Sequence, residues 1–272
     1  MKKLFLVLTL SFLLGHLIDA QVEISKATSE RIDGLFKQID ETTPGYMIGV
    51  VKDSDFIFEK GYGSANLEYN IPIGKQSAFN IASLSKQFTG ACVALLMLDG
   101  KISMEDDIKK FIPDFPGYGK KIKIKHLIYM TSGINDYYYN TRENGTDWSS
   151  LNFFNIDNAI SASLSNKRLM YEPGSQWSYS NINYMLLTKV VEKVSGMRFA
   201  EFAQKRLFEP LKMTNTFVND DIFQVIPNRV NGYNYRNEEN TSELIENGYL
   251  NNTSDGFLQI NRNSPHYGGS GV

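Results

Sequence analysis

The stretch that most constrains this chain runs from Phe79 to Gly100 and reads FNIASLSKQFTGACVALLMLDG. From Phe88 onward the residues are mostly apolar, and a helix that is hydrophobic all round is buried inside a domain. Gly100 follows the run at the place where a left-handed residue caps a helix. The sequence therefore predicts a buried helix that begins near Ser83 and ends at Gly100.

Ser83 and Lys86 stand three residues apart at the start of this helix, so their side chains share one face. The unpaired N–H groups and the dipole of a helix N-terminus favour negative charge there. A serine nucleophile needs such a place, because it requires a proton acceptor and donors for the oxyanion that follows. A Ser-x-x-Lys pattern is short, and the alternative interpretation is a helix-capping serine followed by a solvated lysine.

The N-terminus, residues 1–20, reads MKKLFLVLTLSFLLGHLIDA. Two lysines precede a mainly apolar run and Ala20 suits the cleavage position, so this segment is typical of a secretory signal peptide. An uncleaved membrane anchor is the alternative, although the apolar run is short for a span of about 20 residues. We therefore expect a secreted or periplasmic protein with a mature chain of residues 21–272.

Composition excludes several classes of function. The formal net charge of −2 offers no reason to expect nucleic acid as a partner. The basic run 120–125 alternates in part with isoleucine, which predicts a strand-like segment with one solvated face. Cys92 is the only cysteine, so no intramolecular disulfide can form, and we expect the thiol to pack in the core. The only histidines are His16, His126 and His266, which argues against a zinc hydrolase.

Periodicity predicts four further helices, over residues 24–40, 159–169, 181–194 and 198–207. Two strand-like runs, 46–51 and 56–62, are joined by a short polar link that predicts a hairpin. The stretch 135–155 is rich in Tyr, Asn and Gly and predicts a long loop, which often lines a site. From Met213 onward little periodicity remains, and the return of the chain to a sheet is hard to find.

Five phrases of this chain together resemble the serine β-lactamase-like superfamily, on its class C β-lactamase, D-alanyl-D-alanine carboxypeptidase and esterase side. They are FNIASLSKQFTG, GKISMEDDIKKFIPDFP, KIKHLIYMTSGI, YEPGSQWSYSNINYMLL and FEPLKMTNT, in the order of the family. The resemblance implies an α/β (α+β) fold for residues 21–272. In that fold an antiparallel sheet is flanked by helices, and a mostly helical region is inserted after the nucleophile helix.

The first motif of the family, Ser-x-x-Lys, matches Ser83 and Lys86, and its second, Tyr-x-Asn, matches Tyr179 and Asn181. Tyr-x-Asn occurs four times in the chain, but only at Tyr179 does it lie within Pro-Gly-x-x-Trp-x-Tyr-Ser-Asn. The structural alternative is a loop aromatic followed by a helix N-cap at Asn181. Both roles can hold at once.

The mechanism that the resemblance implies has Ser83 attacking a carbonyl while Lys86 and Tyr179 share the removal of its proton. A neighbouring ammonium favours the tyrosinate, and Tyr179 can then return the proton to the leaving group. Asn181 would bind Lys86 or the substrate amide, and the Ser83 N–H would supply half an oxyanion hole. The implied catalytic residues are therefore Ser83, Lys86 and Tyr179, with Asn181 as a substrate-binding residue and with no metal or cofactor.

The third motif of the family is Lys-Thr-Gly, or His-x-Gly in many relatives, on a strand beside the active site. His266-Tyr267-Gly268 fits His-x-Gly in form, but the segment resembles the glycine-rich turn of the family, so we interpret His266 as a loop residue. We therefore expect a C-terminally truncated member. Its sheet would keep an unpaired edge and uncovered apolar surface, which favours aggregation.

Three functions remain open at this point. The leading hypothesis is a secreted, monomeric serine hydrolase that acts through an acyl-enzyme on a small-molecule or peptide substrate. That substrate would be a D-alanyl peptide, a β-lactam or a small ester. The second is a non-catalytic relative that binds the cell wall, and the third is an inactive truncated fragment.

Overall fold

The computed structural model describes residues 23–116, 118–137, 155–221, 223–237, 241–242, 245–246 and 256–260. The predicted signal peptide, His266 and most of the predicted loop 135–155 lie outside these residues. The chain divides into two compact units, residues 1–77 and 78–272, which are described in turn. No helix in the described ranges is long and apolar enough to cross a membrane.

In the first unit, residues 23–77 form one helix and four strands: α1 (Lys26–Leu35), β1 (Tyr46–Lys52), β2 (Asp55–Tyr62), β3 (Ser64–Asn66) and β4 (Ile71–Pro72). The helix predicted over residues 24–40 is shorter than expected. It ends at Leu35, because the Phe36 N–H bonds the Asp33 carbonyl three residues back instead of continuing the α-helical ladder. The Asp33 carboxylate accepts hydrogen bonds from Lys60 Nζ and Tyr62 OH, each at 2.7 Å, and so ties α1 to β2.

The predicted hairpin is confirmed in β1 and β2, which pair antiparallel with Lys52 opposite Asp55. The two residues between them, Asp53 and Ser54, have φ angles of 51° and 72°. Positive φ at both central residues is the geometry of a type I′ turn, whose twist matches that of the flanking strands. The polar link therefore sets the register of this pair.

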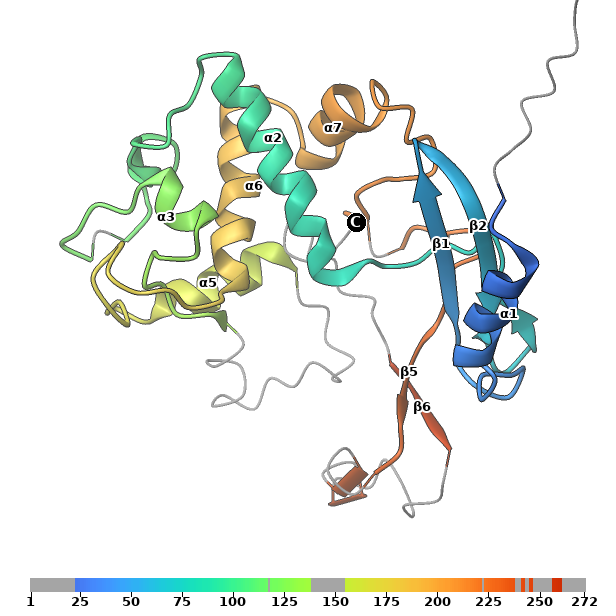
Figure 1. Ribbon diagram of the computed structural model, residues 1–272. Coiled ribbons are helices and arrows are strands. Elements are labelled where there is room, and N and C mark those ends of the chain that lie inside the picture. Colours follow the sequence, from blue (N-terminus) through green and yellow to red (C-terminus); the bar gives the residue numbers. More distant parts are fainter. Residues whose placement is uncertain are drawn as a thin grey trace, which may run out of the picture. The chain divides into compact units, whose positions relative to one another are not determined.

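The described residues of the second unit begin with the short turns η1 (Ala82–Ser85) and η2 (Ile108–Lys110) and the helices α2 (Lys86–Leu98), α3 (Ile124–Ile128), α5 (Ile156–Ser165) and α6 (Asn181–Ser195). They continue with α7 (Phe199–Ala203), the π-helical turn η3 (Gln204–Phe208), β5 (Gly232–Tyr235) and β6 (Phe257–Ile260). Helices α2 and α6 run side by side (Figure 1), and their facing residues form much of the hydrophobic core. That core places the start of α2 near the start of α6.

Helix α2 is buried on one face, so the prediction of burial on every side is wrong. Cys92, Val93 and Leu96 are fully buried, whereas Leu98 is 84% exposed. Burial raises the pKa of the Cys92 thiol to about 12, which agrees with the expected packing role. The expected cap is confirmed, because Gly100 has a φ of 70° and its N–H bonds the Met97 carbonyl at 2.9 Å.

The described strands form three antiparallel pairs, β1–β2, β3–β4 and β5–β6. All helices from α2 to α7 lie between β4 and β5 in the sequence. The predicted fold class, antiparallel strands with helices and a helical region after the nucleophile helix, is thereby confirmed. The pair β5–β6 lies where the sequence offers no periodicity, and its register joins Gly232 to Ile260 and Tyr235 to Phe257.

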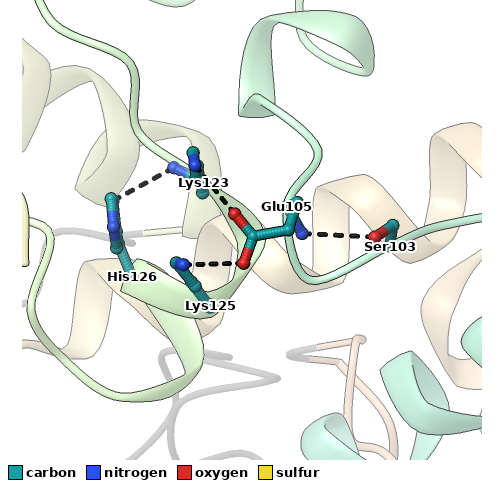
Figure 2. Close-up of polar contacts among 5 residues, drawn as sticks. All are labelled: Ser103, Glu105, Lys123, Lys125 and His126. Atoms are coloured by element: carbon teal, nitrogen blue, oxygen red, sulfur yellow. Dashed lines mark hydrogen bonds and ion pairs between the residues drawn. The ribbon is translucent and has the colours of Figure 1, made fainter.

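The basic run 120–125 does not form the predicted strand. Lys123 makes one isolated antiparallel bridge with Asp107, and α3 begins at the next residue, Ile124. Figure 2 shows Lys123 and Lys125 turned onto one carboxylate, that of Glu105, at 2.7 Å and 2.6 Å. The alternation of lysine and isoleucine thus reflects the entry into a helix and an ion-pair cluster.

His126 lies beside the same cluster and caps the N-terminus of α3. Its Nδ1 accepts a hydrogen bond from the Lys123 N–H at 3.2 Å and so completes the N-terminus of α3 (Figure 2). Burial, followed by the charges of Lys125 and Lys123, lowers the pKa of His126. The neutral imidazole is the form that can accept this bond.

Candidate active site

Ser83 lies in the 3-10 turn η1, one turn before the α-helix in which it was expected. The turn is entered through Ala82, whose φ is 49° and whose N–H bonds Asn80 Oδ1 at 2.8 Å. Ser85 Oγ closes it by donating to the Ala82 carbonyl at 2.6 Å. In 3-10 geometry residues three apart eclipse each other, so Ser83 still lies over Lys86, the first residue of α2.

Lys86 is a buried cation that faces Ser83. The residue is only 8% exposed, and its Nζ donates to Ser83 Oγ at 3.1 Å and to Asn181 Oδ1 at 2.8 Å. The rings of Tyr179 and Tyr184 lie 5.0 Å and 5.9 Å from Nζ, within the range of cation–π attraction. The alternative interpretation of Lys86 as a solvated first-turn lysine is therefore wrong.

Tyr179 reaches the same serine from the second motif. Its hydroxyl lies 2.6 Å from Ser83 Oγ, across 96 residues of sequence. Tyr179 is 43% exposed, so solvent reaches the site from its side, whereas Lys86, on the other side of Ser83 Oγ, is buried. Two groups that can exchange a proton with the serine hydroxyl thus contact it directly.

Asn181 is the first residue of α6, and the N-cap position belongs to Ser180. The alternative of a helix-capping role for the Asn181 side chain is therefore wrong, because its Oδ1 accepts from Lys86 instead. A carbonyl oxygen at this place orients the ammonium beneath Ser83. All four residues predicted from the two motifs, Ser83, Lys86, Tyr179 and Asn181, are brought together.

Tyr179 is carried to Ser83 by a segment that is hydrogen-bonded to the chain after α3. Three backbone hydrogen bonds of 2.8–3.1 Å hold it, from Met170 to Gly133, from Gly174 to Thr131 and from Ser178 to Met130. Gly133 has a φ of 77°, and a Cβ there would lie 2.4 Å from the Tyr171 carbonyl oxygen. The close approach of these two segments depends on that glycine.

Tyr184 is a site residue that the motifs did not identify. Its OH donates to the Ile128 carbonyl at 3.2 Å, which fixes the ring that faces Lys86. Burial, and then the neighbouring Tyr179, raise its pKa. The available signal was helical spacing, because Tyr184 lies three residues after Asn181 on one face of α6.

The part of the chain that the structure describes contains no cluster of three or more His, Cys, Asp and Glu side chains able to hold a metal ion. The acid–base groups at Ser83 are a phenol and an amine. This set suits the nucleophilic attack of a serine on a carbonyl. The candidate third motif, His266, lies beyond the described residues.

Comparison with known proteins identifies the same family that the motifs indicated. The family model described as Beta-lactamase matches residues 32–249. Penicillin-binding protein 4* of Bacillus subtilis (strain 168) is 34% identical over 187 residues, which are 66% of this chain and 39% of that protein. This chain therefore spans about two fifths of the length of that relative.

Solved structures with a similar fold include the octameric penicillin-binding protein homologue from Pyrococcus abyssi. Its TM-score is 0.71 at 22% identity, with 90% of this chain and 52% of that chain covered. The D-amino acid amidase from Ochrobactrum anthropi SV3 has a TM-score of 0.69 at 20% identity, with 88% and 63% covered. Since the family model matches well over half of the sequence, the chain belongs to the Beta-lactamase family.

Proposed function

We propose that this protein is a serine hydrolase that forms an acyl-enzyme at Ser83 with an amide or an ester. One observation carries the proposal: Ser83 Oγ lies 2.6 Å from Tyr179 OH and 3.1 Å from Lys86 Nζ. A serine hydroxyl becomes a nucleophile when an adjacent group takes its proton. Membership of the Beta-lactamase family supports this chemistry.

The first step is the attack of Ser83 on the substrate carbonyl. Tyr179 OH lies within the distance at which a general base takes a proton. Lys86 Nζ lies 3.1 Å from Ser83 Oγ and 5.0 Å from the centre of the Tyr179 ring, so the amine and the phenol are neighbours at the serine. We assign proton removal to the Tyr179–Lys86 pair in the state in which the two side chains together carry one proton fewer than a phenol and an ammonium, since both groups contact Ser83 Oγ.

The second step requires donors for the oxyanion of the tetrahedral intermediate. The backbone hydrogen bond that opens η1 runs from the Leu84 N–H to the Ile81 carbonyl at 3.1 Å. The Ser83 N–H lies one residue earlier in the chain. An N–H at this position has no carbonyl acceptor within its own helix. We assign it as one oxyanion donor, because it belongs to the nucleophile itself.

Collapse of the intermediate breaks the amide or ester bond and leaves the acyl group on Ser83 Oγ. The leaving group takes the proton held by the Tyr179–Lys86 pair. Water then attacks the acyl carbon, the pair takes a proton from the water, and Ser83 leaves with that proton. The products are a carboxylic acid and an amine or alcohol.

The substrates that fit this proposal are a D-alanyl peptide, a β-lactam and a small ester. The name of one similar protein, a penicillin-binding protein, supports a β-lactam, and the name of another, a D-amino acid amidase, supports an amide next to a D-configured residue. The sequence of residues 1–20 supports a place outside the cytoplasm, secreted or periplasmic.

The test is covalent labelling of the full-length protein with a fluorescent penicillin and with a fluorescent phosphonate ester. We expect labelling of the peptide that contains Ser83, and its loss in Ser83→Ala. Ser165→Ala is the matched control, because Ser165 is an exposed serine at the end of α5. Labelling that survives in Ser83→Ala would contradict the proposal. Muropeptide affinity without hydrolysis would favour the non-catalytic, cell-wall-binding alternative.

A further inference from the structure

Asp136 is a buried carboxylate that the mechanism above does not use. The residue is 4% exposed and lies in the segment that follows α3. Its Oδ2 accepts a hydrogen bond of 2.5 Å from the backbone N–H of Asn181. The bond joins two residues 45 positions apart and ends inside the second motif.

The start of α6 explains how this charge is accommodated. A buried carboxylate is costly unless hydrogen bonds and positive charge compensate it. The first turn of a helix offers both, in its unpaired N–H groups and its dipole. The N-cap residue, Ser180, makes no side-chain capping bond, so Asp136 supplies this acceptor from another part of the chain.

The same segment contacts the motif at a second point. Ser180 Oγ donates to the Ile134 carbonyl at 3.5 Å. Ile134 and Asp136 therefore hold two consecutive residues of the motif, and Tyr179 directly precedes them. The Asn181 side chain extends from the backbone that Asp136 holds, and its Oδ1 lies 2.8 Å from Lys86 Nζ.

We propose that Asp136 is a positioning residue for the acylation of Ser83. Its carboxylate fixes the backbone of Asn181, and through it the placement of Asn181 on Lys86 and of Tyr179 on Ser83. The proposal rests on the proposed function, because the reaction that it serves is the acylation of Ser83. In this role Asp136 acts through the backbone of Asn181.

The test compares Asp136→Ala, Asp136→Asn and Val190→Ala in the full-length protein, with the fluorescent penicillin as the acylating probe. In Asp136→Ala we expect the maximal acylation rate to fall about 100-fold, the loss that a 1 Å misplacement can produce. The probe concentration at half-maximal rate should change little. Asp136→Asn should be acylated about 10-fold faster than Asp136→Ala, since its amide oxygen accepts the same hydrogen bond without the charge.

Val190→Ala is the control for a purely structural effect. Val190 is fully buried in α6, more than two turns beyond Asn181, so this variant weakens the same helix without touching the site. We expect a lower melting temperature and an unchanged acylation rate at temperatures where the variant is folded. A loss of rate equal to that of Asp136→Ala would overturn the positioning role, and so would a wild-type rate in Asp136→Ala.

A second readout does not depend on activity. The backbone amide proton of Asn181 should resonate far downfield in the wild type and move upfield in Asp136→Ala, and the Asn181 side-chain amide should shift with it. Unchanged resonances would overturn the proposal even if the wild type does not react with the probe. Failure of the wild type to react would count against the proposed function alone. If Asp136→Ala does not fold, the Asp136→Asn variant decides: a wild-type acylation rate together with a displaced Asn181 amide resonance overturns the proposal.

Discussion

Lys86 is the residue on which the proposed chemistry depends most. Its ammonium is buried, donates to two oxygens and lies against two aromatic rings. Burial of a charge is costly without such compensation, and Asn181 Oδ1 together with the rings supplies part of it. The local structure therefore stabilises a positive charge directly beneath the nucleophile.

The variant Lys86→Met tests this dependence, because it keeps the length of the side chain and removes its charge. We expect the acylation rate of Ser83 to fall by about 100-fold or more, the usual share of general acid–base catalysis. The Asn181 carbonyl loses its donor, at a cost in stability of about 1–3 kcal/mol. Rates follow from probe labelling, and stability from urea unfolding. Lys101→Met, at an exposed lysine just after α2, serves as the control; an equal rate in both variants would rule out a role for Lys86.

At the scale of residues, the sequence predicted which four side chains come together, because the two motifs name them; their catalytic roles stay predictions. Ser83, Lys86, Tyr179 and Asn181 were all identified, and the structure brings them within hydrogen-bonding distance of one another. Tyr184 was not identified, because its role depends on which face of α6 meets α2. Asp136 was missed for a similar reason, since a contact across 45 residues leaves no local pattern.

Among the elements, the segment after α3 and the segment that carries Tyr179 approach each other closely at Gly133. A Cβ there would lie 2.4 Å from a backbone oxygen, and the φ of 77° is strained for any residue with a side chain. We expect Gly133→Ala to lower the free energy of unfolding by about 1–3 kcal/mol, the usual cost of such strain. Chemical denaturation monitored by circular dichroism measures this change.

Gly90→Ala provides the matched control, because at this position the same substitution should raise the free energy of unfolding. Gly90 lies inside α2, and a Cβ at this position meets no atom within 4 Å. Alanine in a helix interior is more stable than glycine by about 0.5–1 kcal/mol. A similar loss in both variants would show that glycine at position 133 has no special conformational role.

The cluster around Glu105 joins the start of α3 to the chain before η2. Hydrogen bonds from Lys123 and Lys125 lower the pKa of the Glu105 carboxyl from its usual 4.5 to about 2. A carboxyl with a depressed pKa stabilises the folded state fully above the unfolded pKa, and this contribution disappears as the pH falls toward the folded pKa. The cluster should therefore lose its effect between about pH 4.5 and pH 2.

Urea unfolding of the wild type and of Glu105→Gln across this range tests the pH dependence. The wild type should lose stability more steeply than the variant between pH 4.5 and pH 2, because glutamine does not titrate. Glu68→Gln removes an exposed carboxylate from the first unit and controls for the general loss of charge. Parallel curves for the wild type and Glu105→Gln would show that the ion pairs add nothing to stability, as is common at surfaces.

Elements were harder to predict from the sequence than residues. The hairpin β1–β2 and the helix α6 were found, because turn chemistry and apolar period are local signals. The basic run 120–125 was misread, since Ile122 and Ile124 alternate like a strand although Ile124 begins α3. The pair β5–β6 was missed, because its register joins residues far apart in the sequence.

On the scale of the whole chain, burial is distributed unevenly among the described elements. Helix α6 contains eight buried residues, whereas α1 contains none. No residue of β1 or β2 is fully buried either. Because local stability follows buried apolar contact, we expect the elements of the two units to open with very different free energies.

Hydrogen exchange followed by mass spectrometry tests this expectation. Amides in the middle of α6 should exchange only through global unfolding and become faster as urea is added, whereas amides of α1 should exchange through local opening with little dependence on urea. Val190→Ala should speed exchange in α6 by about 10- to 100-fold, because truncation of a buried side chain destabilises the core by a few kcal/mol. Exchange in α1 should stay as in the wild type. If α1 accelerated as much as α6, the two elements would belong to one cooperative unit, and their difference in burial would not determine how the chain opens.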